Sequence, residues 1–550
     1  MQSRLSLSLS FLIALLFLSL TQIATAGSAT WNLTPANVRW NSSSNWTPVT
    51  VPDGPNDIAT FALSNTTAVS LASASIEINS IVFAAGASAF TIDLGTISGL
   101  TISGAGITND SGVTQNFNIP RDLGSGWITF SGSATAGGSD VIYTNNGYGS
   151  NGGADILFLD NSSAGEATFI NSFAMYFNDR STAANATFIN NAGDARDASP
   201  GYVYFSYVGG GSAEGATFIN NGATVRGARG GQTMYYASQS LGHSTVIANG
   251  GTADGAGGGY VDIGNGNVGS AGGATLIANG GTNGGDGGYI SITFGTAHCR
   301  VEVFGNGIFD VGHGVNTAKI GSLEGDGKVF LGNNQLLVGL TDQATVFSGT
   351  MIEDQNDSGG SFGVIGGSIT LTGANHYTAG TVILDGNLIV NSRGGSGTGS
   401  GPVDVEAGRL GGRGVIAGTV TVGTGTGAGA ALAPGRSLHR IDTLTILSAL
   451  TFNADATYSF ELDSSSTIAD SVVANGVTIN NGAQFSANET GNVSLPSGTE
   501  FTVINNTGSA AILGTFANLP DGGTITIGSN TFQANYEGGD GNDLTLTVMP

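Results

Sequence analysis

The sequence has a single cysteine, Cys299, among its 550 residues. No intramolecular disulfide can therefore form, and stability must come from backbone hydrogen bonds and packing. Basic residues are also scarce, because 15 Lys and Arg stand against 39 Asp and Glu, which gives a net charge of −24. Such a surface repels phosphate backbones and argues against nucleic-acid binding. Neutral glycans, other surface proteins (cationic ones above all) and divalent cations remain acceptable partners.

Long apolar runs are absent after the first residues. Residues 1–26 contain one basic residue, Arg4, then an apolar run from Leu5 to Leu20, and they end in Ala-Thr-Ala. This pattern is typical of a secretory signal peptide and makes Gly27 the predicted first residue of the mature chain. No later stretch is long and apolar enough to span a membrane. We therefore expect an exported protein without a transmembrane segment, in the medium, on the cell surface or in the periplasm.

Helical patterns are missing as well. After residue 30, no stretch of ten residues has the periodicity of an amphipathic helix. What the chain has instead is glycine, 92 residues of it, together with Asn, Ser and Thr between short Val, Ile and Phe runs. This composition predicts an all-β protein built from many short strands and tight turns.

Short runs recur between residues 154 and 294. "EATFINS", "NATFINN", "GATFINN", "STVIANG" and "ATLIANG" place their threonines at steps of 19, 30, 28 and 30 residues. A second set of runs, "GYVYF", "TMYY", "GYVDI" and "GYISI", alternates with the later ones. The period predicts a solenoid in which each repeat adds one coil of parallel strands about 4.8 Å from the last. The threonines expected to stack are Thr168, Thr187, Thr217, Thr245 and Thr275.

Asparagine stands at the end of these runs. It tolerates left-handed backbone conformations, and amides stacked coil on coil can hydrogen-bond to one another. The candidates for such a ladder are Asn171, Asn190, Asn220, Asn249 and Asn279.

These repeats resemble those of autotransporter-type passenger proteins. "GGSITLTGANHYTAGTVILDGNLIVN", residues 366–391, is similar to the autotransporter-associated β-strand repeat, although His376 and Ala379 depart from its usual residues. Residues 40–61 and 513–548 resemble the first and last parts of such proteins. The resemblance implies a right-handed parallel β-helix (a solenoid) with β caps at both ends, exposed on or shed from bacterial cells.

One part of that family's architecture is missing from the sequence pattern. A complete autotransporter has a C-terminal translocator barrel, whereas the last hundred residues here are passenger-like. Transport to the surface would then need a separate secretion system. The predicted organisation is a signal peptide (1–26), an N-terminal cap with the first coils (27–153), the Ala-Thr-Phe-Ile-Asn repeats (154–297), the autotransporter-associated region (298–430) and the C-terminal coils with their cap (431–550).

Two rows of apolar side chains compete for the inside of the repeats. Strand alternation sends neighbouring residues to opposite faces, so only one row can point inward. One row is Phe169, Phe188, Phe218, Val246 and Leu276; the other is Ile170, Ile189, Ile219, Ile247 and Ile277. The outer row would form an apolar stripe suited to a partner or to self-association.

Three tyrosines occupy equivalent repeat positions: Tyr202, Tyr260 and Tyr289. Pointing outward, they would form a ladder able to stack on sugar rings. Pointing inward, they would belong to the core. Stacking of the rings on each other is the third reading, and the sequence leaves the three open.

The chain offers little catalytic chemistry. "AHCRVEVF" has the alternation of a strand with Cys299, Val301 and Val303 on one face, which predicts a buried structural cysteine. The five histidines (His243, His298, His313, His376 and His439) show no metal-ligand or triad spacing, and Asp286, Asp310, Asp326 and Asp354 have no pattern that brings them together. We therefore predict no enzymatic activity, with a polysaccharide lyase or hydrolase as the alternative.

"GGDGND", residues 538–543, matches the glycine-aspartate turn whose stacked copies bind Ca²⁺. Asp540 and Asp543 are its candidate ligands. A lone copy offers too few oxygens for Ca²⁺, so we predict a turn that leads into a last strand and expect no cofactor.

Three tryptophans, Trp31, Trp40 and Trp46, crowd the start of the predicted mature chain. A solenoid has an open sheet edge at each end, and such edges need covering. We predict that these rings fold over the first coils. The function predicted from the sequence is structural or adhesive: a secreted or cell-surface solenoid that presents a repetitive surface.

Overall fold

The computed structural model describes residues 27–550 except 72–73, 96–97, 121–125, 147–154, 207–210, 237–239, 265–271, 294–297, 315, 354–358, 428 and 436–439. The predicted signal peptide lies outside these residues. Within them the structure is all-β, and its one helix is the 3₁₀ helix η1 (Ser43–Asn45). In this described part, no helix is long and apolar enough to cross a membrane. The chain divides into two compact units, Met1–Phe169 and Ile170–Pro550, with β12 (Thr168–Asn171) at the boundary.

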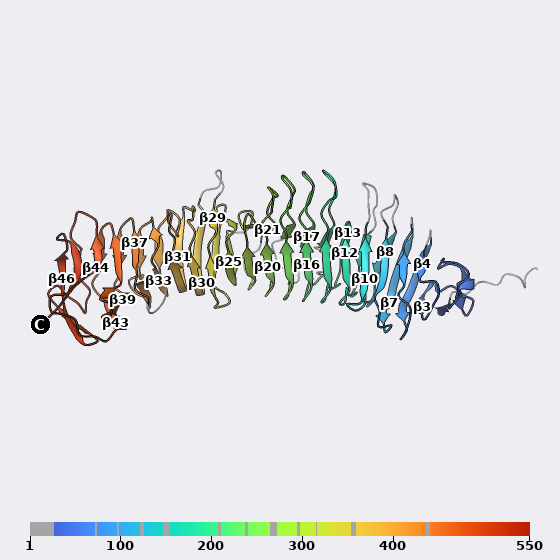
Figure 1. The fold of residues 1–550 in the computed structure, drawn as a ribbon, viewed down its shortest axis with the longest axis horizontal. Helices are drawn as coiled ribbons and strands as arrows, with labels where there is room; N and C mark the ends of the chain where they lie inside the picture. The colour runs from blue at the N-terminus through green and yellow to red at the C-terminus, as the bar shows by residue number, and fades with distance from the viewer. Residues whose placement is uncertain are drawn as a thin grey trace, which may run out of the picture. The chain divides into compact units, whose positions relative to one another are not determined.

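The first unit is built from two columns of parallel strands (Figure 1). One column is β1 (Ala29–Trp31), β3 (Gly54–Phe61), β5 (Ser75–Phe83), β7 (Gly99–Asn109), β9 (Trp127–Phe130) and β11 (Asp155–Phe158). The other is β4 (Ala68–Ser70), β6 (Thr91–Asp93), β8 (Gln115–Ile119) and β10 (Val141–Asn145). Successive strands along the chain alternate between the columns from β3 onward, so that each coil adds one strand to each column, which is the arrangement of a β-solenoid.

An aromatic cap closes the N-terminal end of this unit. Trp31, Trp40 and Trp46 are at most 1% exposed, and the centroids of their rings lie 6.1, 5.7 and 5.6 Å from that of the Phe61 ring. Phe61 stacks in turn on Phe83 at 5.3 Å. The predicted folding of the tryptophans over the first coils is confirmed.

The indole N–H groups of the three buried tryptophans all have hydrogen-bond acceptors. The indole nitrogen of Trp31 donates to the carbonyl of Thr66, that of Trp40 to Pro52, and that of Trp46 to Trp40. The short strand β2 (Trp46–Thr47) pairs antiparallel with β1, so the parallel pairing of the solenoid strands ends at β1. A buried indole N–H without a partner would cost about 1–3 kcal/mol.

Removing residues 27–61 tests the cap. The deletion uncovers the Phe83 and Phe90 rings and leaves the edge of β5 unpaired, so we expect the truncated chain to aggregate. Light scattering coupled to size-exclusion chromatography measures this, with the uncut chain run under the same conditions. A truncated chain that elutes as a soluble monomer would contradict the prediction.

The second unit has the same construction over more coils. Its first column is β13 (Ala174–Phe177), β15 (Tyr202–Phe205), β17 (Gln232–Tyr235), β19 (Tyr260–Ile263), β21 (Tyr289–Ile292), β23 (Ile308–Asp310), β26 (Lys328–Phe330) and β29 (Thr350–Ile352). Its second column is β14 (Thr187–Asn190), β16 (Thr217–Asn220), β18 (Thr245–Ala248), β20 (Thr275–Ala278), β22 (Arg300–Val303), β25 (Ser322–Gly325) and β28 (Ala344–Phe347). All these pairings are parallel.

The second column continues through longer, bent strands. β28 pairs with β30 (Ser361–Leu371), which is followed by β31 (Gly380–Val390), β33 (Arg409–Gly412), β36 (Ala430–Pro434), β39 (Ala456–Asp463) and β43 (Gln484–Glu489). The other halves of β30 and β31 join a branch of β24 (Thr317–Ile320), β27 (Gln335–Val338), β32 (Val403–Val405), β35 (Val420–Val422), β38 (Leu450–Phe452) and β42 (Val477–Ile479). Residues 366–391 therefore contain the second half of β30 and the whole of β31.

The C-terminal end changes from parallel to antiparallel pairing. β34 (Val415–Ile416), β37 (Thr443–Ile446), β41 (Ser471–Ala474) and β44 (Glu500–Asn506) stack in parallel. They are followed by β47 (Asp543–Val548), β46 (Asn530–Gly538) and β45 (Thr524–Ile527), each antiparallel to the one before, while β40 (Ile468–Ala469) pairs antiparallel with β39. This meander is the predicted C-terminal β cap.

Stacking in the repeats is in register. Thr187 pairs with Thr217, Thr217 with Thr245, and Thr245 with Thr275. Phenylalanines stack in the same way inside the coil, with the rings of Phe188 and Phe218 4.9 Å apart and 9° from parallel. The predicted stacking of one coil per repeat is confirmed, because identical residues meet at the spacing between strands.

Glycine is required where each long loop closes. The amide of Gly201 donates to the carbonyl of Asn191 at 2.8 Å, and the same bond recurs at Gly231, Gly259 and Gly288. A Cβ at Gly201 would lie 2.0 Å from the Asn171 carbonyl oxygen of the neighbouring coil. No other residue fits, which explains the glycine that opens "GYVYF" and its relatives. The closed loops project from the green part of the chain in Figure 1.

The asparagines form two ladders where the sequence predicted one. In the inner ladder, Asn171 donates to Asn190 and Asn190 to Asn220, at 3.0 and 2.9 Å between amide N and O, and all three are buried. Asn249 and Asn279 lie one position later, because Ala248 and Ala278 occupy the inner position in their repeats. They belong to a half-buried outer ladder of Asn191, Asn221, Asn249 and Asn279. Amide bonding between coils is confirmed, and the grouping of the five in one ladder was wrong.

Asn190→Asp tests the inner ladder without changing side-chain size. The buried amide donates to Asn220 Oδ1 and to the Gln232 carbonyl, so a carboxylate there would face two acceptors. We expect the free energy of unfolding at neutral pH to fall by more than about 2 kcal/mol, with partial recovery in acid, where the carboxyl is protonated. Urea denaturation measures it. Asn191→Asp in the half-buried outer ladder is the control, and equal losses in both variants would refute the claim.

Candidate functional site

The outer side of the first column carries a group of tyrosines, which we call the tyrosine face: Tyr176, Tyr202, Tyr204, Tyr236, Tyr260 and Tyr289. Tyr202, Tyr260 and Tyr289 share one register position, with Gln232 between the first two. All are half-buried, whereas Val203, Val261 and Ile290 beside them are fully buried. The three predicted tyrosines therefore point outward.

The ring geometry shows what this face can offer. Tyr260 and Tyr289 stack with ring centroids 5.5 Å apart and planes 7° from parallel, so each ring covers one face of the other. Tyr202 meets Tyr176 edge-on at 5.9 Å, and their hydroxyl oxygens are 2.6 Å apart. Mutual stacking uses ring faces that a sugar would need, and it leaves ring edges and hydroxyl groups for contacts.

Two carboxylates bind tyrosine hydroxyls on this face. Tyr236 donates to Asp262 and Tyr289 donates to Asp310. Burial, and then the hydrogen bond and charge of Asp310, raise the pKa of Tyr289; burial, then Asp262 and Asp310, raise the pKa of Tyr260. Both hydroxyls therefore stay protonated in neutral solution and act as donors.

Asp310 also holds a histidine that the sequence did not single out. Its Oδ2 lies 2.9 Å from His313 Nδ1, and its Oδ1 accepts from the Gly312 amide at 2.7 Å. Asp310 is 2% exposed, while the imidazole is largely exposed and lies beside the Phe330 ring at 6.3 Å. The carboxylate fixes the imidazole orientation. The Asp-x-x-His spacing in the sequence was a signal for the contact between Asp310 and His313. No sequence pattern indicated that Tyr289 would bind the same carboxylate, because only the fold brings it there.

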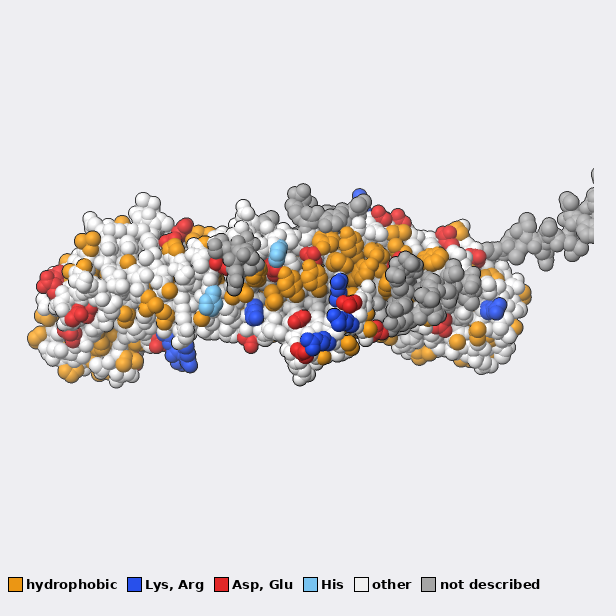
Figure 2. Space-filling view, turned by 90° about the horizontal axis from the view of Figure 1, so that it is seen from above, with side chains coloured by type: hydrophobic (Ala, Val, Ile, Leu, Met, Phe, Trp, Pro, Cys, Tyr) orange, Lys and Arg blue, Asp and Glu red, His pale blue; other side chains and the backbone are white. Residues whose placement is uncertain are grey.

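In the space-filling view, apolar side chains, tyrosine included, gather beside a group of basic and acidic side chains (Figure 2). Two strands of the tyrosine face, β15 and β17, follow directly after the loops that carry Arg196, Arg226 and Arg229. Arg226 pairs with Asp254 at 3.1 Å, but both side chains are more than two-thirds exposed, so the pair contributes little to stability.

The second column presents a different outer surface. Its inner row is Phe169, Phe188, Phe218, Val246 and Leu276, all fully buried, so the isoleucine row points outward and is half-buried. With the threonines it forms the threonine–isoleucine face: Thr187, Thr217, Thr245, Thr275, Ile189, Ile219, Ile247 and Ile277. It ends at β22, where Arg300 and Glu302 take the equivalent positions and pair with each other at 2.9 Å.

Cys299 is buried, as predicted. It alternates with Val301 and Val303 toward the core, while His298 and Arg300 are exposed. Burial raises the pKa of the thiol to about 12. A thiol with that pKa is not a nucleophile in neutral solution, which agrees with a structural role.

The glycine-aspartate segment is a turn between two antiparallel strands. β46 ends at Gly538, β47 begins at Asp543, and the predicted turn into the last strand is confirmed. Asp543 is 7% exposed and its Oδ1 accepts from the Asn506 amide at 2.9 Å, so it anchors the turn to β44. Asp540 is exposed. Across the described residues, no group of three or more His, Cys, Asp or Glu side chains is placed to hold a metal ion.

The four aspartates considered from the sequence have separate environments. Asp310 is buried in β23, whereas Asp286 and Asp326 are exposed and lie outside the strands. Asp326 accepts from the Gly305 amide at 2.8 Å. Asp354 lies outside the described residues, as does His439.

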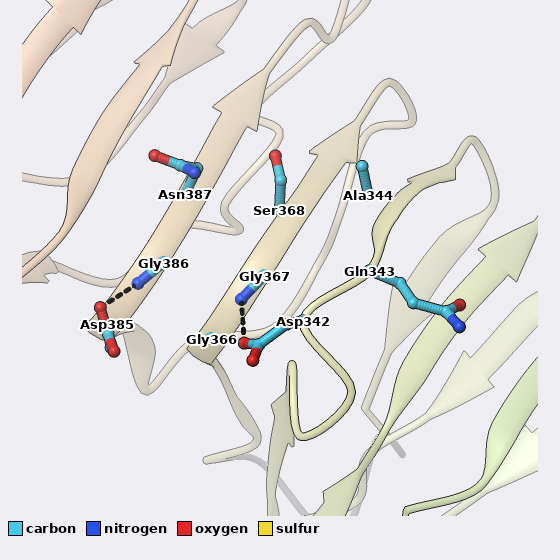
Figure 3. A pocket seen from close by; sticks show the side chains of 9 residues that line it. All are labelled: Asp342, Gln343, Ala344, Gly366, Gly367, Ser368, Asp385, Gly386 and Asn387. Carbon is cyan, nitrogen blue, oxygen red and sulfur yellow. Dashed lines mark hydrogen bonds between the residues drawn. The ribbon is translucent and has the colours of Figure 1, made fainter.

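A hollow of about 380 Å³ lies at the start of β28, beside the irregular middle parts of β30 and β31 (Figure 3). Asp342 accepts from the Gly367 amide at 3.2 Å and Asp385 from the Gly386 amide at 2.7 Å. Both glycines have positive φ, at the point where the register of β30 against β31 shifts. The two carboxylates therefore bind backbone at a bulge, which is a structural task.

Asp470 is a buried carboxyl in the C-terminal coils whose pKa is raised. It is fully buried, its Oδ1 accepts from the Asp442 amide at 3.0 Å, and its Oδ2 has no hydrogen-bond partner among the described residues. Burial raises its pKa from 3.8 to about 8; the nearby Glu461 charge also raises it, and Arg409 opposes the rise. The side chain is therefore largely protonated in neutral solution.

This pKa gives the stability a pH dependence. Between about pH 4 and pH 8 the folded state binds a proton at Asp470 that the unfolded state has lost, so stability falls as pH rises through this window. Asp470→Asn keeps an acceptor for the Asp442 amide and removes the titration. We expect the variant to be more stable than the parent near pH 9 and similar near pH 4.

Urea midpoints at the two pH values measure the effect, and Asp540→Asn, at an exposed turn, serves as the control. A parent and Asp470→Asn variant that lose stability equally between the two pH values would contradict the assignment.

No protein-family model matches the chain, and no match was found among curated proteins. Its function is therefore argued from the sequence pattern and from the geometry of its surfaces.

Proposed function

We propose that this protein is an exported structural or adhesive solenoid that presents a repetitive surface to glycans or to other surface proteins. The observation that carries the proposal is the in-register repetition of outward side chains. Thr187, Thr217 and Thr245 recur on one face at the spacing of the coils, and the tyrosines recur on the other. Such rows contact many units of a polymer at once, each of them weakly. The summed contacts then give a useful affinity without a deep pocket.

Of the two faces, we assign glycan contact to the tyrosine face. Its ring edges are apolar, and the Tyr289 and Tyr236 hydroxyls bonded to carboxylates create polar positions beside them. Sugars combine C–H surfaces with hydroxyl groups, so both kinds of contact are useful. The net charge of −24 favours a neutral glycan for a face that itself contains Asp262 and Asp310.

Export is part of the proposal. It rests on the signal-peptide pattern of residues 1–26 and on the similarity of residues 366–391 to the autotransporter-associated repeat. Membership of that group would place the mature chain at or beyond the bacterial cell surface. Fractionating the producing cells tests this, because a chain confined to the cytoplasm would refute it.

Co-sedimentation with insoluble neutral polysaccharides tests the adhesive role. With cellulose and chitin as probes, we expect the chain to sediment with at least one, and Tyr260→Thr/Tyr289→Thr to reduce the bound fraction about tenfold, because both outward side chains are lost while strand propensity is kept. Ile247→Thr/Ile277→Thr, on the threonine–isoleucine face, is the matched control.

Equal loss in both double variants would remove the tyrosine face from the proposal, and no binding to either probe would remove the neutral glycan. Release of soluble sugars from a probe would instead favour the enzymatic alternative.

A further inference from the structure

A groove of about 760 Å³ lies in the C-terminal part of the second unit. Four successive passes of the chain line it: the residues after β31, the start of β34, the residues that lead into β37, and β40. The lining side chains are Asn391, Ser392, Arg393, Arg413, Val415, Ile441, Asp442, Thr443, Ile468 and Ala469. It is about twice the volume of the hollow beside Asp385.

Two arginines make this groove unusual in an acidic chain with only 15 basic residues. Asn391 and Arg413 lie on adjoining coils, since Val390 pairs with Gly412 and the Arg413 amide donates to Asn391 Oδ1 at 3.2 Å. Arg393 follows two residues after Asn391. Among the described residues, neither guanidinium is within ion-pair distance of a carboxylate, in contrast to Arg226 and Arg300.

The remaining lining supplies two further kinds of contact. Ile441, Ile468 and Val415 are the larger apolar side chains of the lining, and Ile468 is 48% exposed. Asp442, Asn391 and Thr443 offer hydrogen-bond acceptors and donors. The Asp442 backbone is held in place by buried Asp470, through the 3.0 Å bond from its amide.

We propose that this groove binds the carboxylated sugar units of an acidic polysaccharide, a uronate chain. The two guanidinium groups match a carboxylate, the isoleucines match the C–H face of a sugar ring, and Asp442 matches its hydroxyl groups. An acidic peptide fits less well, because it offers the isoleucines no C–H face of a sugar ring and its carboxylates alone would have to make the contact.

The groove is separate from the tyrosine face in sequence and in its lining residues. The proposal therefore does not depend on neutral-glycan adhesion, and each can fail alone. Together they would give one chain two kinds of carbohydrate contact, one with a neutral glycan and one with a charged glycan.

Calorimetric titration of the purified chain with uronate oligosaccharides tests the proposal. The probes are oligomers of galacturonate, glucuronate and mannuronate, with the methyl ester of the galacturonate oligomer as a neutral analogue of the same ring. We expect at least one uronate to bind, and about tenfold weaker binding of the galacturonate ester than of its acid if galacturonate binds. Arg393→Gln and Arg413→Gln should each weaken binding about tenfold, and raised salt should weaken it in the parent.

Arg196→Gln, an exposed arginine far along the chain from the groove, is the matched control and should bind like the parent. Circular dichroism confirms that the variants fold. The proposal is overturned if no uronate binds, if the arginine variants bind normally, or if the ester binds as tightly as the acid. Binding of hexaglutamate as tight as that of the best uronate would reassign the groove to acidic peptides.

Discussion

Parallel stacking in register is the constraint on which the structure depends. Each coil must return its strands to the position of the coil before, because a strand inside a column hydrogen-bonds to its counterparts one coil earlier and one coil later. Thr187, Thr217, Thr245 and Thr275 stack for this reason, and so do the Phe188 and Phe218 rings. A chain with one cysteine has no covalent means of fixing the coils. Backbone ladders, aromatic stacks and buried amides do so, and the two ends need caps because stacking has to stop there.

The same constraint decides how much the sequence could predict. Repeat spacing gave the solenoid, the coil period and the threonine column, since each depends on residues a fixed number apart. The Trp31, Trp40 and Trp46 cap followed from the need to cover an edge. Alternation placed Cys299 inside, but it could not choose between the Phe188 and Ile189 rows, because alternation alone does not say which side faces the core.

Sites formed between distant passes of the chain were beyond the sequence. The shift from Asn220 to Asn249 between ladders depends on Ala248 taking the inner position, which only strand register reveals. Tyr289, Asp310 and His313 meet because β21 and β23 are neighbours. The groove that contains Arg393 and Arg413 is lined by four passes of the chain. Their spacing in the sequence is irregular, so no motif predicts the groove. Packing also set the ring planes of Tyr260 and Tyr289, and with them the kind of contact that the tyrosine face can make.

The loops that close at Gly201, Gly231, Gly259 and Gly288 have a consequence for how this protein can change. In the stacked loops, a Cβ at Gly222 would lie 2.0 Å from the Gly250 carbonyl oxygen, and a Cβ at Gly258 would lie 2.0 Å from that of Gly287. Backbone touches backbone from one loop to the next, so a side chain gained in one loop displaces its neighbour. Single substitutions are thus poorly tolerated there, whereas the duplication or loss of a whole repeat keeps every contact. Over evolutionary time, this part of the molecule should change in length more readily than in sequence.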